Sequence, residues 1–187
     1  MSELAWHLSR ATGVVGLVLM TAVVVLGLLT SGRRRPSGAT TTVVVALHRW
    51  LALGVVAFLV VHVVTAVADG YVDIGWLATL VPLTSGYETW QVALGTLTVD
   101  LLLAVVVTSL LRHRIPERAW RAVHWLGLAA WPVALVHGFA MGTSDRPVLR
   151  GATVLCTVVG SAAIGWRLTA TYADRDARRR VLAQGWS

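Results

Sequence analysis

Four of the six histidines in this chain lie in long apolar segments, where an ionisable side chain is costly and usually functional. His48 and His62 share one segment, and His124 and His137 share another. On a helix, positions 48 and 62 are separated by roughly 21 Å and point to nearly the same face, and positions 124 and 137 are separated by roughly 20 Å. Because the two segments cross a membrane in the same direction, the sequence predicts two facing histidine pairs at two depths.

Two imidazoles that face each other at one level suit the axial ligation of a haem iron, for which neutral imidazole is the ligand. A zinc site would need four close ligands, and no thiol or carboxylate accompanies either pair. A proton relay in a transporter or channel is an alternative, as is a structural membrane subunit with vestigial sites. Covalently attached haem is excluded, because Cys156 is the only cysteine and C-x-x-C-H does not occur.

The spacing on the second segment departs from an ideal helix. His124 and His137 are 13 residues apart, which at about 100° per residue leaves them well over ~90° apart around the axis. Pro132 lies between them and removes one helical hydrogen bond. We therefore expect a kink or a local change of winding near Pro132 that turns His137 toward its partner.

The histidine segments are two of five apolar runs that each reach the roughly 20 residues needed to cross a bilayer. Only 13% of the residues are charged, against about 25% in a soluble domain. Since lipid offers the backbone no hydrogen-bond partner, these runs must be helical. The sequence predicts an all-α integral membrane protein in which residues 1–187 form a single bundle, with spans at about residues 9–30, 42–68, 89–111, 119–141 and 148–171.

Two further features refine this bundle. Residues 74–84 are apolar but too short to cross, and Pro82 interrupts them, so we expect a short segment at the outer interface or a re-entrant piece. Gly13, Gly16 and Gly27 in the first span allow a neighbouring helix to approach closely.

The distribution of charge predicts the topology. All 16 basic residues are arginines, and most lie in the loop after the first span, the loop after the third span and the tail at residues 172–187. The positive-inside rule places these regions in the cytoplasm and therefore places the N-terminus outside. Because the arginines gather at span ends, the formal net charge of +7 does not indicate nucleic acid. Membrane lipid is the expected partner of the tail.

Some charged side chains near the spans have expected roles. Arg10 near the outer end of the first span and Arg49 at the inner end of the second are expected to bind haem propionates, because a guanidinium binds a carboxylate bidentately. Arg146 and Arg150 compete for this role on the outer side. Asp100, in the middle of the third span, should be paired or protonated. A structural hydrogen bond to a threonine and a part in proton or quinone handling are both open for it.

The two histidine segments resemble a known family. The runs LHRWLALGVVAFLVVHVVTA (residues 47–66) and RAWRAVHWLGLAAWPVALVHG (residues 118–138) resemble the haem helices of the ferric reductase-like transmembrane family. NADPH oxidases, ferric reductases and the haem-binding subunit of the bacterial methionine sulfoxide reductase system belong to it. The resemblance, which covers about residues 8–171, implies two non-covalent haem b groups. It pairs His48 with His124 on the inner side and His62 with His137 on the outer side.

The resemblance also implies a function in a bacterial plasma membrane. Oxidases and ferric reductases of the family carry a soluble flavin- and NADPH-binding portion, whereas this sequence has no G-x-G-x-x-G. We therefore expect an electron-transfer component of an oxidoreductase system, without a flavin of its own. Its donor would be a separate cytoplasmic flavin reductase or membrane quinol, and its acceptor a separate protein outside. A ferric or quinone reductase acting at the outer haem is the nearest alternative.

Overall fold

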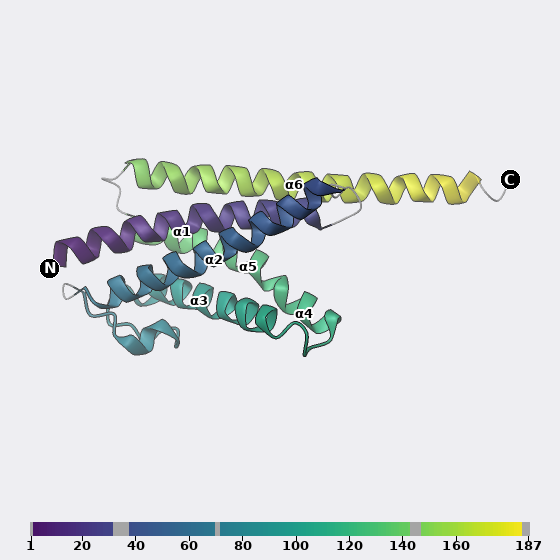
Figure 1. Ribbon diagram of the computed structural model, residues 1–187. Coiled ribbons are helices and arrows are strands. Elements are labelled where there is room, and N and C mark those ends of the chain that lie inside the picture. The colour runs from purple at the N-terminus through teal and green to yellow at the C-terminus, as the bar shows by residue number, and fades with distance from the viewer. Residues whose placement is uncertain (1, 32–37, 70–71, 143–146, 185–187) are drawn as a thin grey trace.

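The computed structural model describes residues 2–31, 38–69, 72–142 and 147–184, with their side chains at residues 4–171 of those ranges. All regular structure in this part of the chain is helical (Figure 1). The elements are α1 (Ser2–Thr30), α2 (Ala39–Val67), the 3-10 helix η1 (Trp76–Thr79), α3 (Thr89–Leu110), α4 (Glu117–His124), α5 (Leu126–Met141) and α6 (Pro147–Gln184).

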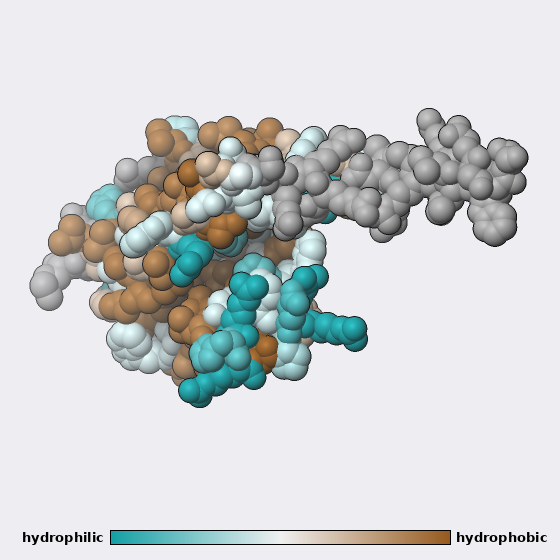
Figure 2. All heavy atoms as spheres, turned by 45° about the vertical axis from the view of Figure 1, so that its right-hand side comes forward, coloured by the Kyte–Doolittle hydropathy of each residue, from teal (hydrophilic) through white to brown (hydrophobic). Residues whose placement is uncertain are grey.

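Five helical segments are long and apolar enough to cross a membrane, in agreement with the five predicted spans. They are Leu4–Thr30, Ala39–Val67, Thr89–Leu110, Glu117–Met141 and Pro147–Thr171. The fourth joins α4 and α5. Large apolar side chains are exposed along the helices, and Figure 2 shows hydrophobic residues over much of the surface, with hydrophilic residues gathered toward one end. This outward-facing apolar surface suits lipid, and the fold is that of an all-α integral membrane protein.

The helices form two antiparallel associations that meet along α1. α2 packs along α1, and α3 packs along α5, while α1 also contacts α5 and α6 (Figure 1). Within the described residues, α2 does not pack closely against either α3 or α5. The two ends of the chain lie at opposite ends of the bundle, and the last part of α6 extends beyond it. The helices that carry the histidines are therefore held in place by other helices, α2 by α1 and α5 by α3 and α1, and not, in the described part of the chain, by direct packing against each other.

A buried tryptophan joins three of these helices. Trp131, in the middle of α5, is only 3% exposed, and its indole Nε1 donates a hydrogen bond of 3.0 Å to Thr21 Oγ1 on α1. A Cβ at Gly160 on α6 would lie 2.1 Å from the Trp131 ring. Only glycine allows this approach, because no real Cβ contact is that short. The contact fixes α5 against α1 and α6 and so fixes the depth of the histidines that flank Trp131.

The fourth span contains a change of winding at Trp125. α4 ends at His124, α5 begins at Leu126, and the Leu128 N–H donates to the Trp125 carbonyl in a tight 3-10 contact. α5 continues through Pro132, which is consistent with the tolerance of proline in helices that neighbouring helices support. An irregular turn at Trp125, which was not predicted, therefore separates the two histidines, and a kink at Pro132 stays a prediction.

The short apolar segment before α3 contains one 3-10 turn and no longer helix. Its Ala78 is buried, and the Ala78 carbonyl accepts a hydrogen bond from the Thr96 hydroxyl on α3. Trp76 and Leu77 are 64% and 65% exposed. The segment is thus attached to α3 by one side and presents apolar side chains on the other, as an interfacial segment would.

Candidate functional site

The structure brings the four intramembrane histidines together as two pairs. His62 on α2 and His137 on α5 have ring centroids 6.3 Å apart, and the rings are inclined at 82°. His48 on α2 and His124 at the end of α4 have centroids 6.2 Å apart, inclined at 55°. We call these the outer pair and the inner pair, after the predicted topology. The expected juxtaposition is present at both levels, while the ligand role of these residues stays a prediction.

The separation within each pair fits two ligands of one iron atom. Each metal–imidazole bond is about 2 Å long, and the ring centre lies roughly 1 Å beyond the nitrogen, so two rings on opposite sides of a metal have centres about 6 Å apart. Among the described residues, no three histidine, cysteine, aspartate or glutamate side chains gather into a metal site. The donor set of two imidazoles suits a haem iron, whose other ligands come from the macrocycle.

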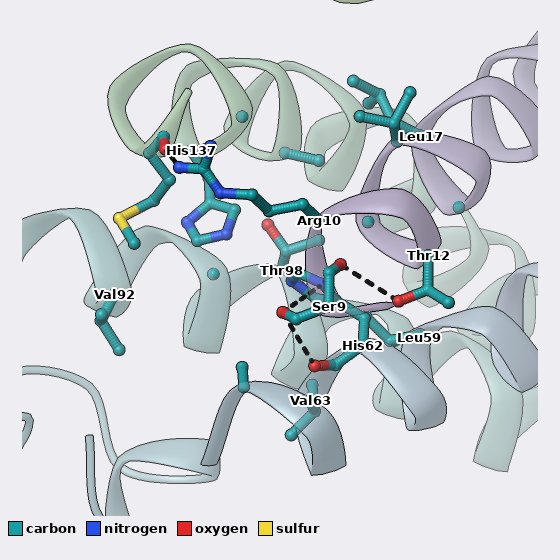
Figure 3. Close-up of a pocket in the computed structure, with 18 of the residues that line it drawn as sticks. Ser9, Arg10, Thr12, Leu17, Leu59, His62, Val63, Val92, Thr98 and His137 are labelled. Atoms are coloured by element: carbon teal, nitrogen blue, oxygen red, sulfur yellow. Dashed lines mark hydrogen bonds between the residues drawn. The ribbon is translucent and has the colours of Figure 1, made fainter. Parts of the chain in front are cut away.

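The outer pair lines a cavity of about 470 Å³, which lies within the size range of cofactor pockets. His62 and His137 enter it from α2 and α5, and Arg10 extends from α1 toward α5 (Figure 3). Most of its other lining residues are apolar, and the segment around η1 contributes Ala78 and Thr79. The inner histidines do not line this cavity. The outer pair is therefore placed in a largely apolar chamber between helices.

Three of the four imidazoles donate a hydrogen bond from Nδ1 to a backbone carbonyl. The acceptor of His62 is Ser9 at 2.7 Å, and Figure 3 labels both residues; the acceptor of His137 is Gln91 at 2.8 Å. His48 donates to Val23 at 3.0 Å. Because a carbonyl can only accept, the proton must be on Nδ1, which leaves the lone pair of Nε2 for a metal. The backbone thus selects the tautomer that can act as a ligand.

Each of these three imidazoles lies against a glycine of the neighbouring helix. A Cβ at Gly13 would lie 2.8 Å from the His62 ring, and one at Gly95 would lie 2.8 Å from the His137 ring. At Gly27 the distance to the His48 ring would be 3.4 Å. The first two distances are too short for any real side chain. These glycines therefore make the room that the imidazoles occupy.

His124 is held differently. Its Nδ1 and the Nε1 of Trp120 are buried and have no hydrogen-bond partner among the described residues. The two rings are stacked, with centroids 4.8 Å apart and planes inclined at 25°. The Arg112 guanidinium lies 4.3 Å from the centre of the Trp120 ring, a cation–π arrangement. A stack of Arg112, Trp120 and His124 thus replaces the carbonyl contact that the other imidazoles make.

The arginines expected to bind propionates lie in different places. Arg10 lines the cavity, lies 4.3 Å over the Trp6 ring and donates from Nη2 to the Met141 carbonyl at 3.1 Å. Arg150 on α6 also lines the cavity, and Arg146 is outside the described residues. Arg49 is exposed on α2 beside His48. The structure therefore places Arg10 and Arg150 at the cavity of the outer pair, and their role toward a propionate stays a prediction.

Asp100 is half-buried in the middle of α3. The hydroxyls of the nearby Thr96 and Thr98 donate to the carbonyls of Ala78 and Leu94 instead. The hydrogen bond to a threonine that was one expectation for Asp100 is not among those of the described residues. Asp100 does not line the cavity of the outer pair.

Fold and site together define a helical membrane protein with paired intramembrane histidines. The family model described as "Ferric reductase like transmembrane component" matches residues 12–136. The chain therefore belongs to the ferric reductase-like transmembrane family, which points to electron transfer across a membrane. His48, His62 and His124 lie within the matched range, and His137 follows it directly. Neither a curated protein nor a solved structure matches the chain.

The sequence interpretation did not assign the glycines and the tryptophan beside the histidines to the site. It attributed Gly13 and Gly27 to helix packing and gave no role to Gly95. One signal was present, because Gly13 and Gly27 have the same 14-residue separation as His48 and His62. Two equal separations on antiparallel helices indicate two equivalent contacts. The stack at His124 follows from an i, i+4 relation to Trp120, a spacing that places two side chains on one helix face.

Proposed function

We propose that this chain binds two haem b groups, one at each histidine pair, and passes single electrons from one side of the membrane to the other. The observation that carries the proposal is the separation of 6.2 and 6.3 Å between the rings of the two pairs. When bound, haem iron supplies reversible one-electron chemistry, which no side chain of this chain provides. The residues around it would hold the iron, exclude water and bind the propionates.

Each imidazole would hold iron through Nε2 while its Nδ1 proton stays on the protein side. The carbonyls of Ser9 and Gln91, which accept hydrogen bonds from the two outer rings, would hold these rings in place as ligands. The apolar side chains of the cavity exclude water, which keeps the change in solvation small. Arg10 would bind a propionate of the outer haem, and Arg49 one of the inner haem, through charge-assisted hydrogen bonds.

The two pairs divide the path across the membrane. Positions 48 and 62 on α2 are separated by roughly 21 Å along the helix axis, most of the roughly 30 Å of a hydrocarbon core. An electron that moves outward runs with the usual inside-negative potential, which favours a full crossing by about 2.3 kcal/mol per 100 mV. We therefore propose the direction from the inner pair to the outer pair.

The donor and the acceptor are separate molecules in this proposal. Splitting the hydride of a nicotinamide into single electrons is flavin chemistry, and the sequence contains no G-x-G-x-x-G. A cytoplasmic flavin reductase or a membrane quinol would reduce the inner haem, and an extracytoplasmic protein would accept from the outer haem. Exposed arginines of the turn between α3 and α4, and of α4 itself, lie near the inner pair and support a cytoplasmic location for that end. They are Arg112 and Arg114 in the turn and Arg118 and Arg121 in α4.

The proposed topology has the N-terminus outside and the C-terminus in the cytoplasm of a bacterial cell. Single cysteines at Thr84 and His113, both exposed, test it in a Cys156→Ala background. A thiol reagent that does not cross the membrane should label position 84 in intact cells and position 113 only after lysis. The opposite pattern would reverse the sides of the two pairs.

Electron transfer can be tested in vesicles that contain the purified chain and entrapped ferricyanide. Dithionite added outside should reduce the entrapped ferricyanide much faster than in protein-free vesicles. His62→Ala should lower the rate to that background, whereas His113→Ala, at an exposed histidine outside the pairs, should not change it. A wild-type rate equal to that of protein-free vesicles, with haem bound, would contradict the proposal.

A further inference from the structure

The four imidazoles are positioned by two different devices, and we propose that this makes His124 the most readily released of the four ligands. In the first device, a helix carbonyl and the glycine four residues after it hold an imidazole of the adjacent helix. In the second, Trp120 stacked under Arg112 holds His124. The proposal rests on the proposed haem binding and assigns Gly13, Gly27, Gly95 and Trp120 as positioning residues.

The first device occurs twice on α1. His62 bonds the Ser9 carbonyl and lies against Gly13, and His48 bonds the Val23 carbonyl and lies against Gly27. In both cases the glycine follows the acceptor by four residues. A helical side chain leans toward the preceding turn and covers the surface there. Glycine therefore uncovers the carbonyl one turn earlier, which an imidazole from the neighbouring helix can then reach.

The same arrangement recurs on a separate pair of helices. His137 of α5 bonds the Gln91 carbonyl of α3 and lies against Gly95, which again follows the acceptor by four residues. α3 and α5 do not share any residue with the α1–α2 pair, so ordinary helix packing in one interface does not explain the recurrence. The same local arrangement, an imidazole bonded to a carbonyl and packed on the glycine four residues later, therefore occurs three times in this fold.

His124 lacks the same device because of the residue opposite it. α3 and α5 are antiparallel, and His137 lies against Gly95. His124 precedes His137 by 13 residues, so Thr108, 13 residues after Gly95, lies opposite His124. The contact between the next turn of the two helices agrees with this register, because a Cβ at Gly127 would lie 3.9 Å from Val105. Thr108 carries a side chain, and its hydroxyl donates to the Ala104 carbonyl at 2.7 Å. The carbonyl that would correspond to Gln91 is thus covered and already bonded. The Nδ1 of His124 is left without a partner among the described residues.

This difference has a chemical consequence for ligation. A hydrogen bond from Nδ1 to a carbonyl fixes the ring and makes Nε2 a stronger donor to the metal, and loss of such a partner costs about 10- to 100-fold in metal affinity. Stacking restrains the His124 ring but does not polarise it in this way. Added imidazole or cyanide should therefore displace His124 before it displaces any other ligand.

Alanine substitutions on α1 and α3 test the glycine device in the full-length purified protein. Gly13→Ala and Gly95→Ala should each lower haem affinity about 10- to 100-fold at the outer site and shift the midpoint potential of that haem alone. Gly165→Ala on α6 is the control, because a Cβ there meets no atom within 4 Å and the position does not line the cavity. It should leave both potentials and both low-spin spectra at their wild-type values.

Substitutions at Trp120 test the second device. Trp120→Leu removes the stack and should loosen the inner haem, so that added cyanide converts it at a several-fold lower concentration. Trp120→Phe keeps a ring on His124 and should restore most of the wild-type behaviour. Trp166→Leu, at an exposed indole on α6, is the control and should have no effect.

The outcomes separate this inference from the proposed function. A wild-type protein without haem contradicts the proposed function. Two haems in the wild type, with unchanged potentials in Gly13→Ala and Gly95→Ala, contradict only the glycine device. If those two proteins do not accumulate, Gly27→Ala decides, since its contact of 3.4 Å is milder and should still shift the inner haem. Cyanide binding first to the outer haem of the wild type would overturn the assignment of His124.

Discussion

The outer and inner histidine pairs have nearly the same ring separation, 6.3 and 6.2 Å, but they are built by different means. Both outer imidazoles bond a backbone carbonyl, lie against a glycine and enter a cavity. At the inner pair only His48 has such a carbonyl, and His124 is stacked on Trp120 beside the break between α4 and α5. The comparison shows that helix placement sets the distance between ligands, while local contacts set how firmly each ligand is held.

The position of the pairs along the helices explains the difference. The outer histidines are inside continuous helices that lie against α1 and α3, where a glycine can uncover a carbonyl. His124 is the last residue of α4, where the winding changes, and the Ala104 carbonyl of α3 opposite it is covered by Thr108. Trp120, one turn before His124 on the same helix face, stacks on the imidazole and takes the place of the carbonyl contact.

The largest expected effect is on the haem content of two double-substituted proteins. One lacks both histidines of one pair, and the other lacks one histidine of each pair. His62→Ala with His137→Ala removes both ligands of the outer haem and should leave one haem per chain. His62→Ala with His48→Ala removes one ligand from each pair and should leave none. Haem content per purified chain, measured as the pyridine haemochrome, distinguishes the two proteins. Equal haem content in both would show that the histidines are not paired in this way.

A smaller effect is expected from the arginines that accompany the two pairs. Arg10 lines the outer cavity, whereas Arg49 is exposed beside the inner pair. A hydrogen bond to a charged group contributes about 1.5–3 kcal/mol, so Arg10→Leu should weaken outer haem binding roughly ten- to hundredfold. Arg49→Leu should weaken inner haem binding less, because an exposed pair is screened by water.

Haem loss to apomyoglobin from each variant measures both effects. Arg10→Lys is a suitable companion to Arg10→Leu, since it keeps the charge and loses the bidentate geometry. Loss of haem from the inner site in Arg10→Leu, with the outer site unchanged, would contradict the placement of Arg10 at the outer pair.

The smallest effect concerns the segment around η1, which contacts only the outer half of the molecule. Thr96→Val removes the hydrogen bond from the Thr96 hydroxyl to the Ala78 carbonyl, worth about 1 kcal/mol. The segment should open more often and admit water-soluble reductant to the outer haem, so that dithionite reduces it a few-fold faster. Thr157→Val, whose hydroxyl bonds the Thr153 carbonyl of its own helix, is the control. An unchanged rate would mean that the segment does not limit access.

Much of the fold was predictable because it depends on composition and period. Five apolar runs predicted five membrane-crossing segments, and the similar spacings of the histidines on two of them, 14 and 13 residues, predicted the pairs. Helices in lipid have few alternatives, so hydrophobic length alone determines most of the architecture. The irregular turn at Trp125 was not predicted, because no residue type at that position marks a change of winding, whereas α5 continues through Pro132.

The details of the site were less accessible from sequence. A backbone carbonyl has no residue type, so the acceptors at Ser9, Val23 and Gln91 leave no signal of their own. Their glycines do leave one, but Gly13 and Gly27 also fit ordinary helix packing. The stack on His124 depends on the turn at Trp125 and on the position of Arg112, both of which are tertiary features. These contacts had to be seen in three dimensions.

The central claim is that each histidine pair binds one haem b, and a redox titration of the purified chain tests it most directly. The visible spectrum should show low-spin, six-coordinate haem, acid acetone should extract it, and the pyridine haemochrome should give about two haems per chain. The titration should resolve two one-electron components, one of which disappears in His137→Ala. A stable protein that contains no haem when produced with adequate haem supply would contradict the account.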